Sequence, residues 1–232
     1  MNNRPLKRLV HVFNVPWALV FIRGQAAMLR ARGVDVHVVT SPGQQLYDFT
    51  AREGITPHAV PIERRIAPFT DLKSLWQLWR LFRRLKPDVV HTHTPKGGLL
   101  GTLSARLAGV PRVIYHIHGF PFVTQRGWKR FVLKMAERIS CRTAHRVLCV
   151  SRSLRGEAEK EGIYPARRIE VPLNGSIGGV DTDGLFNPER LPAGERQRIR
   201  SALGLAPDDP VIGFVGRLSH DKGMAELAGA WS

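Results

Sequence analysis

The stretch DVVHTHTPKGGLLG, residues 88–101, predicts a buried strand over 88–93 that runs through a short loop into a helix over 99–108. Outward from it, short apolar runs alternate with helical patterns along most of the chain. This alternation indicates a mainly parallel sheet with helices on both faces. The sequence therefore predicts an α/β fold with a Rossmann-like, doubly wound parallel sheet. The other expected strands are 7–13, 34–39, 55–60, 112–118 and 146–151, and the other expected helices are 19–32, 44–53, 71–86, 128–143 and 153–161.

The periodic pattern stops between residues 172 and 188, where four glycines and two prolines indicate a crossing between domains. Beyond it we expect a helix over 195–203, a buried strand over 211–215 and a helix over 223–231. The sequence thus predicts a first domain over 1–187 and the first strand and helix of a second Rossmann-like domain over 188–232. Because such a piece cannot bury a core of its own, we expect the second domain to be truncated.

The 232 residues include 35 lysines and arginines against 19 aspartates and glutamates, which gives a net charge of +16. Such a charge attracts nucleic acid, phosphate-bearing small molecules or an anionic membrane surface. Half of the excess lies in 123–155, where nine residues are basic and only Glu137 is acidic. The longest apolar run, 15–22, is much shorter than the roughly 18 to 20 residues that cross a bilayer. The two cysteines form no CxxC motif, which fits a reducing compartment.

In sheets of this kind, ligands bind in the loops that follow the carboxyl ends of the strands. The first of these loops, 14–17, lacks the G-x-G-x-x-G fingerprint, which argues against a dehydrogenase. We interpret Gly24 as a point of close helix packing. The alternative is that Phe21, Arg23 or Gly24 contacts a ligand.

The loop of the opening stretch could bind an anion. Gly97 and Gly98 would let backbone N–H groups approach a phosphate at the start of the helix, and Lys96 would supply positive charge. Glycines at helix starts are also common as plain turns, so both interpretations stay open.

Two H-x-H pairs, His91 with His93 and His116 with His118, end neighbouring expected strands. Alternate residues share a face of a strand, so a metal site is conceivable. No Asp or Glu occurs from residue 89 to 136, however, whereas hydrolytic metal sites usually recruit carboxylates. We therefore expect no metal and interpret the first three histidines as core residues. His118 comes last before a glycine, so we expect it at the rim where a ligand binds.

The expected helix 128–143 carries an apolar stripe with basic residues beside it. We expect the stripe to pack on the sheet and the basic face to meet solvent, while a helix of this kind can also lie on an anionic membrane. The stripe consists of Trp128, Phe131, Val132, Met135 and Ile139.

The stretch GRLSHDKG, residues 216–223, follows the expected strand 211–215 and opens a helix. Gly216 lets the backbone turn, and Arg217 and Lys222 bracket the start of the helix. Two cations beside a helix N-terminus suit a diphosphate.

Residues 211–223, VIGFVGRLSHDKG, resemble the signature that opens the donor domain of family 4 glycosyltransferases, which are retaining enzymes of the GT-B fold. Residues 91–101, 115–122 and 174–188 resemble the subgroup that builds capsular polysaccharide, exopolysaccharide and O-antigen repeat units on lipid carriers. The resemblance implies a GT-B N-terminal, acceptor-side domain over 1–187 and the start of the C-terminal, donor-binding domain over 188–232.

Residue by residue, the resemblance implies that Arg217 and Lys222, with Gly216, hold the diphosphate of the donor and that His118 reaches the transferred sugar. Gly178-Gly179 stands where the family often has Asn-Gly. The first loop lacks the Gly-Gly that many members place near the donor phosphates, which leaves acceptor binding as a role for 16–24. The E-x7-E carboxylates of the family have no counterpart within these residues, so we expect the chain alone to be inactive.

The resemblance implies transfer of a hexose from a nucleotide diphosphate sugar to a lipid-linked saccharide, with retention, in surface polysaccharide biosynthesis. It also implies no metal cofactor and a cytoplasmic protein, peripheral on the inner face of the cell membrane. Two alternatives are a GT-B sugar-nucleotide epimerase and a basic nucleic-acid-binding module. The sequence has no RNP, helix-turn-helix or zinc pattern, so we expect no nucleic acid partner.

Overall fold

The computed structural model describes residues 5–175, 178–184, 186–216, 218 and 222–231. The chain divides into two compact units, 1–179 and 180–232. The roles that the resemblance assigns to the two parts stay predictions.

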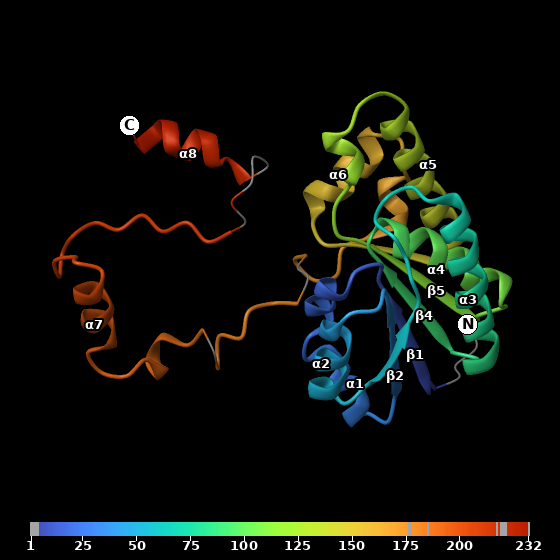
Figure 1. The fold of residues 1–232 in the computed structure, drawn as a ribbon, viewed down its shortest axis with the longest axis horizontal. Coiled ribbons are helices and arrows are strands. Elements are labelled where there is room, and N and C mark those ends of the chain that lie inside the picture. Colours follow the sequence, from blue (N-terminus) through green and yellow to red (C-terminus); the bar gives the residue numbers. More distant parts are fainter. Residues whose placement is uncertain (1–4, 176–177, 185, 217, 219–221, 232) are drawn as a thin grey trace. The chain divides into compact units, whose positions relative to one another are not determined.

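The first unit contains a seven-stranded, wholly parallel sheet, drawn as arrows in Figure 1. The strand order β3-β2-β1-β4-β5-β6-β7 reverses direction between β1 and β4, so the predicted doubly wound, Rossmann-like sheet is confirmed. The strands are β1 (Arg8–Val12), β2 (Asp35–Thr40), β3 (Thr56–Ala59), β4 (Val89–His93), β5 (Arg112–Ile117), β6 (Arg146–Cys149) and β7 (Ile169–Glu170).

Helices cover both faces of this sheet. One core cluster joins η1, α1 and α2 to β1 and β2, and a second joins α3 and α4 to β1 and β4 on the opposite face. There α4 packs between α3 and α5. The helices of this unit are η1 (Pro16–Ile22), α1 (Gln25–Ala31), α2 (Gln44–Glu53), α3 (Pro68–Leu85), α4 (Pro95–Leu107), η2 (Pro121–Thr124), α5 (Gly127–Thr143), α6 (Arg152–Lys160) and η3 (Ala166–Arg168).

The chain from 16 to 31 differs from the single helix expected over 19–32. A 3-10 helix, η1, ends before Gly24, and α1 begins after it. Gly24 has φ +73°, and a Cβ built on it would meet no heavy atom within 4 Å. The prediction of close helix packing at Gly24 is therefore wrong, because the position needs a left-handed backbone rather than a missing side chain.

The first residues of the expected apolar stripe of α5 face solvent rather than the sheet. Trp128 and Phe131 are 64% and 63% exposed, whereas Glu137, Ser140 and Cys141 are buried. Glu137 can face inward because the hydroxyl of Tyr115 on β5 donates to its Oε2 at 2.6 Å. The interpretation of the stripe as a packing surface is wrong for Trp128 and Phe131.

Helix α4 begins at Pro95, four residues earlier than expected, and brings its glycines against the sheet. A Cβ on Gly98 would lie 2.3 Å from Cε2 of the buried Tyr115 ring, and one on Gly101 would lie 2.7 Å from Cγ2 of Thr92. These glycines therefore let α4 approach β4 and β5 more closely than any side chain would allow.

The second unit contains η4 (Pro188–Arg190), α7 (Glu195–Ala202) and α8 (Met224–Trp231). The strand expected over 211–215 is not formed, and Val215 is fully exposed. An extended segment becomes a strand only when a neighbour supplies the ladder of hydrogen bonds, and none of the described residues pairs with it. Across the described residues of both units, no helix is long and apolar enough to cross a membrane.

We expect Gly98→Ala to lower the free energy of unfolding by about 1–3 kcal/mol, because the added methyl overlaps a ring that has no room to move. Urea denaturation of the purified chain measures the change. Gly156→Ala in α6 is the matched control: a Cβ there meets nothing within 4 Å, so helix propensity should leave stability equal or raise it by up to about 1 kcal/mol. Equal effects of the two substitutions would contradict the packing argument.

Candidate functional site: the carboxyl edge of the sheet

The loops after β1 and β4 diverge at the carboxyl edge, where the strand order reverses. A doubly wound sheet binds its ligand at such a point, because the loops separate there and leave a crevice. Thr94, the first residue after β4, has φ 62° and ψ 150°, which is unusual for a residue with a side chain. Its Oγ1 accepts a hydrogen bond from the backbone N–H of Asn14 at 3.3 Å, which joins the two loops.

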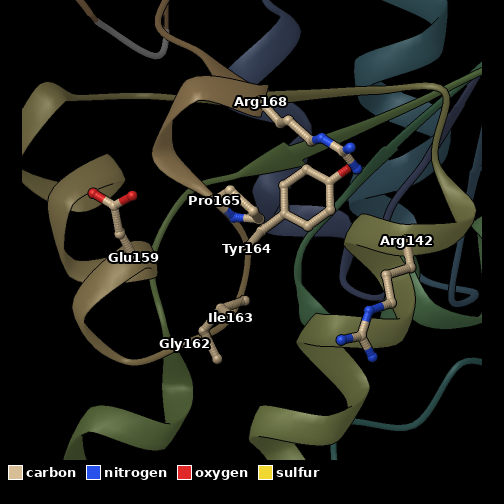
Figure 2. A pocket seen from close by; sticks show the side chains of 7 residues that line it. All are labelled: Arg142, Glu159, Gly162, Ile163, Tyr164, Pro165 and Arg168. Carbon is tan, nitrogen blue, oxygen red and sulfur yellow. The ribbon is translucent and has the colours of Figure 1, made fainter.

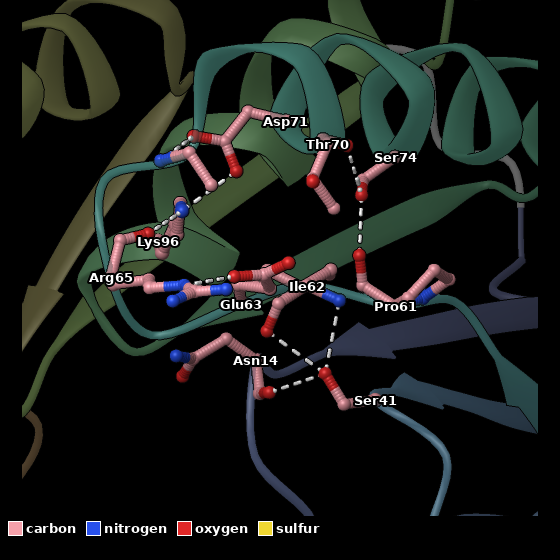
Figure 3. A network of polar contacts seen from close by, with 11 residues as sticks. Asn14, Ser41, Pro61, Ile62, Glu63, Arg65, Thr70, Asp71, Ser74 and Lys96 are labelled. Carbon is pink, nitrogen blue, oxygen red and sulfur yellow. Dashed lines mark hydrogen bonds and ion pairs between the residues drawn. The ribbon is translucent and has the colours of Figure 1, made fainter.

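A polar network holds the neighbouring loops together (Figure 3). Oγ of Ser41, after β2, lies 2.9 Å from the carbonyl oxygens of Asn14 and Ile62 and accepts from the N–H of Ile62 at 2.9 Å. The loops after β1, β2 and β3 thereby share one hydroxyl group. The loops at this edge are thus fixed to one another.

Lys96 belongs to this network. Its Nζ lies 2.7 Å from Oδ1 of Asp71 on α3 and donates to the backbone carbonyl of Arg65 (Figure 3). Gly97 and Gly98 beside it are buried, and a Cβ on Gly97 would lie 2.8 Å from Oγ1 of Thr94. The structure therefore gives all three residues a packing or pairing role, and phosphate contact by this loop stays a prediction.

Five histidines form one row on the α1–α2 face of the sheet. The parallel register pairs His11 with His91 and His93 with His116, and residues two apart on a strand share a face. His118 follows His116 at the end of β5 and completes the row. Neighbouring ring centroids lie between 4.1 and 5.7 Å apart. The sequence prediction identified four of these histidines and missed His11, which only the register of β1 against β4 reveals.

Hydrogen bonds connect three of these rings. Nδ1 of His11 lies 3.0 Å from Nε2 of His93, and Nδ1 of His93 lies 3.0 Å from Nε2 of His118. Phe13 stacks on His93 with centroids 4.3 Å apart, and Phe21 of η1 stacks on His118 at 4.6 Å. The two phenylalanines cover ring faces that water would otherwise reach.

Burial keeps all five imidazoles neutral. Desolvation, with a smaller contribution from His116, lowers the pKa of His11 to about 3, and desolvation lowers that of His116 to about 4. The pKa of His118 is lowered to about 3 for the same reasons as that of His11. The pKa values of His91 and His93 lie well below the usual value. A neutral imidazole offers one N–H and one lone pair, so each ring can both donate and accept.

His118 lies at the carboxyl edge, as expected, but its ring is half-buried. Its Nε2 is hydrogen-bonded to Nδ1 of His93. Its Nδ1 is shielded from solvent and has no hydrogen-bond partner among the described residues. A buried polar atom without a partner in the fold needs an explanation, and pairing with a bound ligand would supply one. The role of His118 in sugar contact stays a prediction.

The first loop presents aromatic and apolar groups rather than phosphate-binding groups. Trp17 and Val20 are 53% and 47% exposed, and Trp17 meets Phe21 edge-on. Arg23 is exposed, while the N–H of Gly24 donates to both carboxylate oxygens of Glu53 at 3.2 Å. The carboxylate of Glu53 therefore occupies the position beside the N–H of Gly24 where a bound anion would have to lie. The sequence signal for this surface was the tryptophan directly after Pro16.

The predicted diphosphate group lies in the second unit. Gly216 and Lys222 are exposed there, and Arg217 lies outside the described residues. Their roles in binding the donor stay predictions.

Two groups of three histidines could hold a metal ion among the described residues: His11, His91 and His93, and His93, His116 and His118. The candidate nitrogens of each group lie within 4.8 Å of one another. Neutral imidazole is the ligating form, but the stretch from 89 to 136 supplies no carboxylate to balance a divalent charge. The absence of a metal cofactor stays a prediction.

Two surface hollows lie away from the histidine row. Figure 2 shows one of about 570 Å³, where the Tyr164 ring lies between Arg142 of α5 and Arg168 of η3. It adjoins the amino end of β7, whereas His118 follows the carboxyl end of β5. A second hollow of similar volume lies between β3 and α3. Neither contains any residue of the histidine row.

A doubly wound sheet with neutral, hydrogen-bonding side chains at its reversal point defines a Rossmann-type ligand-binding domain. The chain belongs to the glycosyl transferase 4-like domain family, whose model matches residues 18–175. The family predicted from the sequence motifs is thereby confirmed.

Curated relatives agree with this family. Over 221 residues the chain is 33% identical to the capsular polysaccharide biosynthesis glycosyltransferase CapM of Staphylococcus aureus, covering 95% of this chain and 56% of that one. It is 32% identical to a UDP-Gal:alpha-D-GlcNAc-diphosphoundecaprenol alpha-1,3-galactosyltransferase of Escherichia coli, covering 84% and 49%. The chain thus spans about half the length of these relatives.

Solved structures share the fold. Anabaena HepE in complex with UDP and glucose matches with a TM-score of 0.71 at 18% identity, covering 98% of this chain and 58% of that one. A UDP-N-acetylglucosamine 2-epimerase matches less well, with a TM-score of 0.55 at 19% identity and coverages of 71% and 47%. Both likenesses concern the fold, which is the GT-B type that the resemblance implied.

We expect the free energy of unfolding to fall as the pH drops from about 6.5 to about 4. The five histidines stay neutral in the fold, while the unfolded chain takes up their protons below the usual pKa of about 6.5. Each histidine contributes at most about 1.4 kcal/mol per pH unit. Urea denaturation of the chain at several pH values from 7.5 to 4.5 measures the slope.

Burial of Glu137 acts in the opposite direction, since it raises the pKa of that carboxyl to about 7. The fold holds this proton between about pH 4.5 and 7 while the unfolded chain releases it, so Glu137 adds stability as the pH falls. Glu137→Gln should therefore steepen the loss of stability toward low pH. If the free energy of unfolding of the unsubstituted chain stayed constant or increased as the pH fell from 6.5 to 4.5, that result would contradict the neutral histidine row.

Proposed function

We propose that the protein containing this chain transfers a hexose from a nucleotide diphosphate sugar to a lipid-linked saccharide, with retention, in surface polysaccharide biosynthesis. The observation that carries the proposal is the neutral His118 at the carboxyl edge, which adjoins the aromatic surface of Phe21 and Trp17 and belongs to a stretch, 89–136, that contains no carboxylate. The similarity to CapM and to a transferase named for a diphosphoundecaprenol acceptor supports the reaction and the acceptor class.

The proposed reaction makes separate demands on the two units. Breaking the bond between the sugar and the diphosphate develops negative charge on the leaving group, which Arg217 and Lys222 would stabilise. A carboxylate near the leaving group would repel it, and residues 89–136 contain none. The loop with Trp17 would receive the acceptor, because exposed aromatic rings pack against sugar rings and apolar chains.

The test is an assay with the protein that contains this chain, a panel of nucleotide diphosphate hexoses and a lipid-diphosphate-linked sugar. We expect transfer that needs the acceptor, keeps the anomeric configuration and has the same rate in a chelator. Interconversion of the free sugar nucleotide without an acceptor would instead identify an epimerase. Tight, steeply salt-dependent binding of single-stranded DNA would favour the nucleic-acid alternative.

We expect Arg217→Ala and Lys222→Ala each to raise the dissociation constant of the donor by about 10- to 100-fold, the effect of removing one charge-assisted hydrogen bond. Isothermal titration with the nucleotide diphosphate sugar measures it. Arg196→Ala, which removes an exposed charge of α7 outside the motif, is the matched control and should leave binding unchanged. Donor binding by both motif variants at the unsubstituted level would refute the assignment.

We further propose that the protein is cytoplasmic and peripheral, docking on the anionic inner face of the membrane through an η2–α5 apolar face, which consists of Val123, Trp128 and Phe131. Their exposed fractions are 56%, 64% and 63%. The cations Arg126 and Lys129 are exposed in the same segment. Exposed aromatic groups flanked by basic residues suit the headgroup region of a bilayer. The segment follows His118 directly, so docking here would bring the lipid-linked acceptor to the site.

We expect the double substitution Trp128→Ser and Phe131→Ser to weaken binding to phosphatidylglycerol vesicles by about tenfold or more, since each aromatic side chain loses part of its apolar burial. Vesicle sedimentation measures the binding. Leu107→Ser is the control, because Leu107 is also 64% exposed but lies at the other end of α4 from the carboxyl edge. Equal losses in the two proteins, or equal binding to neutral vesicles, would contradict this docking surface.

A further inference from the structure

The three hydrogen-bonded rings of the histidine row form a chain in which His93 is the middle member. Both of its nitrogens are engaged, Nε2 with His11 and Nδ1 with His118, each at 3.0 Å. A neutral imidazole has one N–H and one lone pair, so His93 must donate in one direction and accept from the other. The three protons are therefore coupled: all N–H groups point from His11 toward His118, or all point the opposite way.

The two ends of the chain decide between these arrangements. Nε2 of His11 and Nδ1 of His118 both lack a partner among the described residues. If the N–H groups pointed toward His11, its Nε2 would bear a proton with no acceptor inside a side chain that is fully buried. Either direction leaves one unpaired N–H and one bare lone pair at the two ends of the chain, and the unpaired N–H is the costlier of the two in a protein interior. The opposite direction leaves the bare lone pair on the fully buried His11 and places the N–H on Nδ1 of His118, which is also shielded from solvent but belongs to a half-buried ring at the edge of the sheet.

The neighbouring rings do not change this choice. His91 and His116 lie beside the chain, with centroids 4.1 Å from His93 and 4.5 Å from His118, respectively. Their Nε2 atoms have no partner among the described residues. Phe13 and Phe21 stack on His93 and His118 and keep water from competing for the two hydrogen bonds. The direction of the chain is thus set by His11, His93 and His118 themselves.

We propose that His93, supported by His11, is a positioning residue that holds His118 in the Nδ1–H tautomer, so that Nδ1 is a hydrogen-bond donor for an oxygen of the bound sugar. The identity of the acceptor oxygen rests on the proposed function. The tautomer itself does not, because it follows from the hydrogen bonds within the fold.

Long-range proton–nitrogen correlation NMR on the chain with 15N-labelled histidine tests the tautomer, since protonated and bare ring nitrogens resonate in separate ranges. At pH 7 we expect His118 and His93 to be protonated on Nδ1 and bare on Nε2. A His118 protonated on Nε2 would overturn the proposal without any variant. This readout needs no activity, so a failed transfer assay and a failed proposal are distinguishable.

Variants of His93 test its role. His93→Phe keeps a ring for Phe13 to stack on but removes both hydrogen bonds, and it should release His118 into a mixture of tautomers. His93→Asn places an amide N–H close to the position of Nδ1 and should preserve the Nδ1–H form. If His93→Phe does not fold, His11→Phe provides a second test. It removes the hydrogen bond between His11 and His93, and it should also release His118 into a mixture of tautomers.

The chain offers a matched control. His37 and His58 form another histidine pair, with Nδ1 2.9 Å from Nε2, on β2 and β3 outside the row. His58→Phe should leave the His118 signals unchanged. In the transfer assay, His93→Phe should raise the KM of the donor by about three- to tenfold, the effect of one misdirected hydrogen bond, while His93→Asn stays near the original value. Unchanged His118 signals in His93→Phe, or equal shifts in His58→Phe, would overturn the positioning role.

Discussion

The parallel register of β1, β4 and β5 is the constraint on which the rest of the site depends. It places His11 opposite His91 and His93 opposite His116, so that polar rings line up at a level of the sheet where apolar side chains normally pack. A shift of one residue would put His11 on the opposite face from the others if β1 slipped against β4, and His116 and His118 there if β5 slipped against β4. The low pKa values, the hydrogen-bonded chain and the position of His118 all follow from this alignment.

Close packing on the opposite face maintains the register. Gly98 and Gly101 allow α4 to lie directly on Tyr115 and Thr92, and the hydroxyl of Tyr115 continues the contact to Glu137 of α5. The two faces of the sheet thus differ. The face under α4 is tightly packed and fixes the strands, whereas the α1–α2 face holds the row of histidines that ends at the carboxyl edge. Hydrogen bonds between neutral partners offset part of the cost of burying these polar groups, at His11, His93 and His118.

The same division explains the surface of α5. Because Glu137, Ser140 and Cys141 face the sheet, the aromatic residues near the start of the helix remain outside. Apolar periodicity in the sequence identified the helix correctly but assigned its inner face wrongly. The periodicity cannot reveal that the hydroxyl of Tyr115, on a strand distant in the sequence, donates a hydrogen bond to the buried carboxyl group of Glu137. The surface that results is the one we propose for the membrane.

The sequence by itself determined the alternation of strands and helices, the doubly wound parallel sheet, the family and the placement of His118 at the end of a strand, because periodicity, turn residues and short motifs are local properties of the chain. Only the tertiary structure decided that His11 joins the histidine row, that Gly98 faces Tyr115, that Lys96 pairs with Asp71 and that Trp128 is exposed. These features depend on contacts between residues far apart in the chain, and such contacts are set by strand register and helix packing rather than by any local pattern.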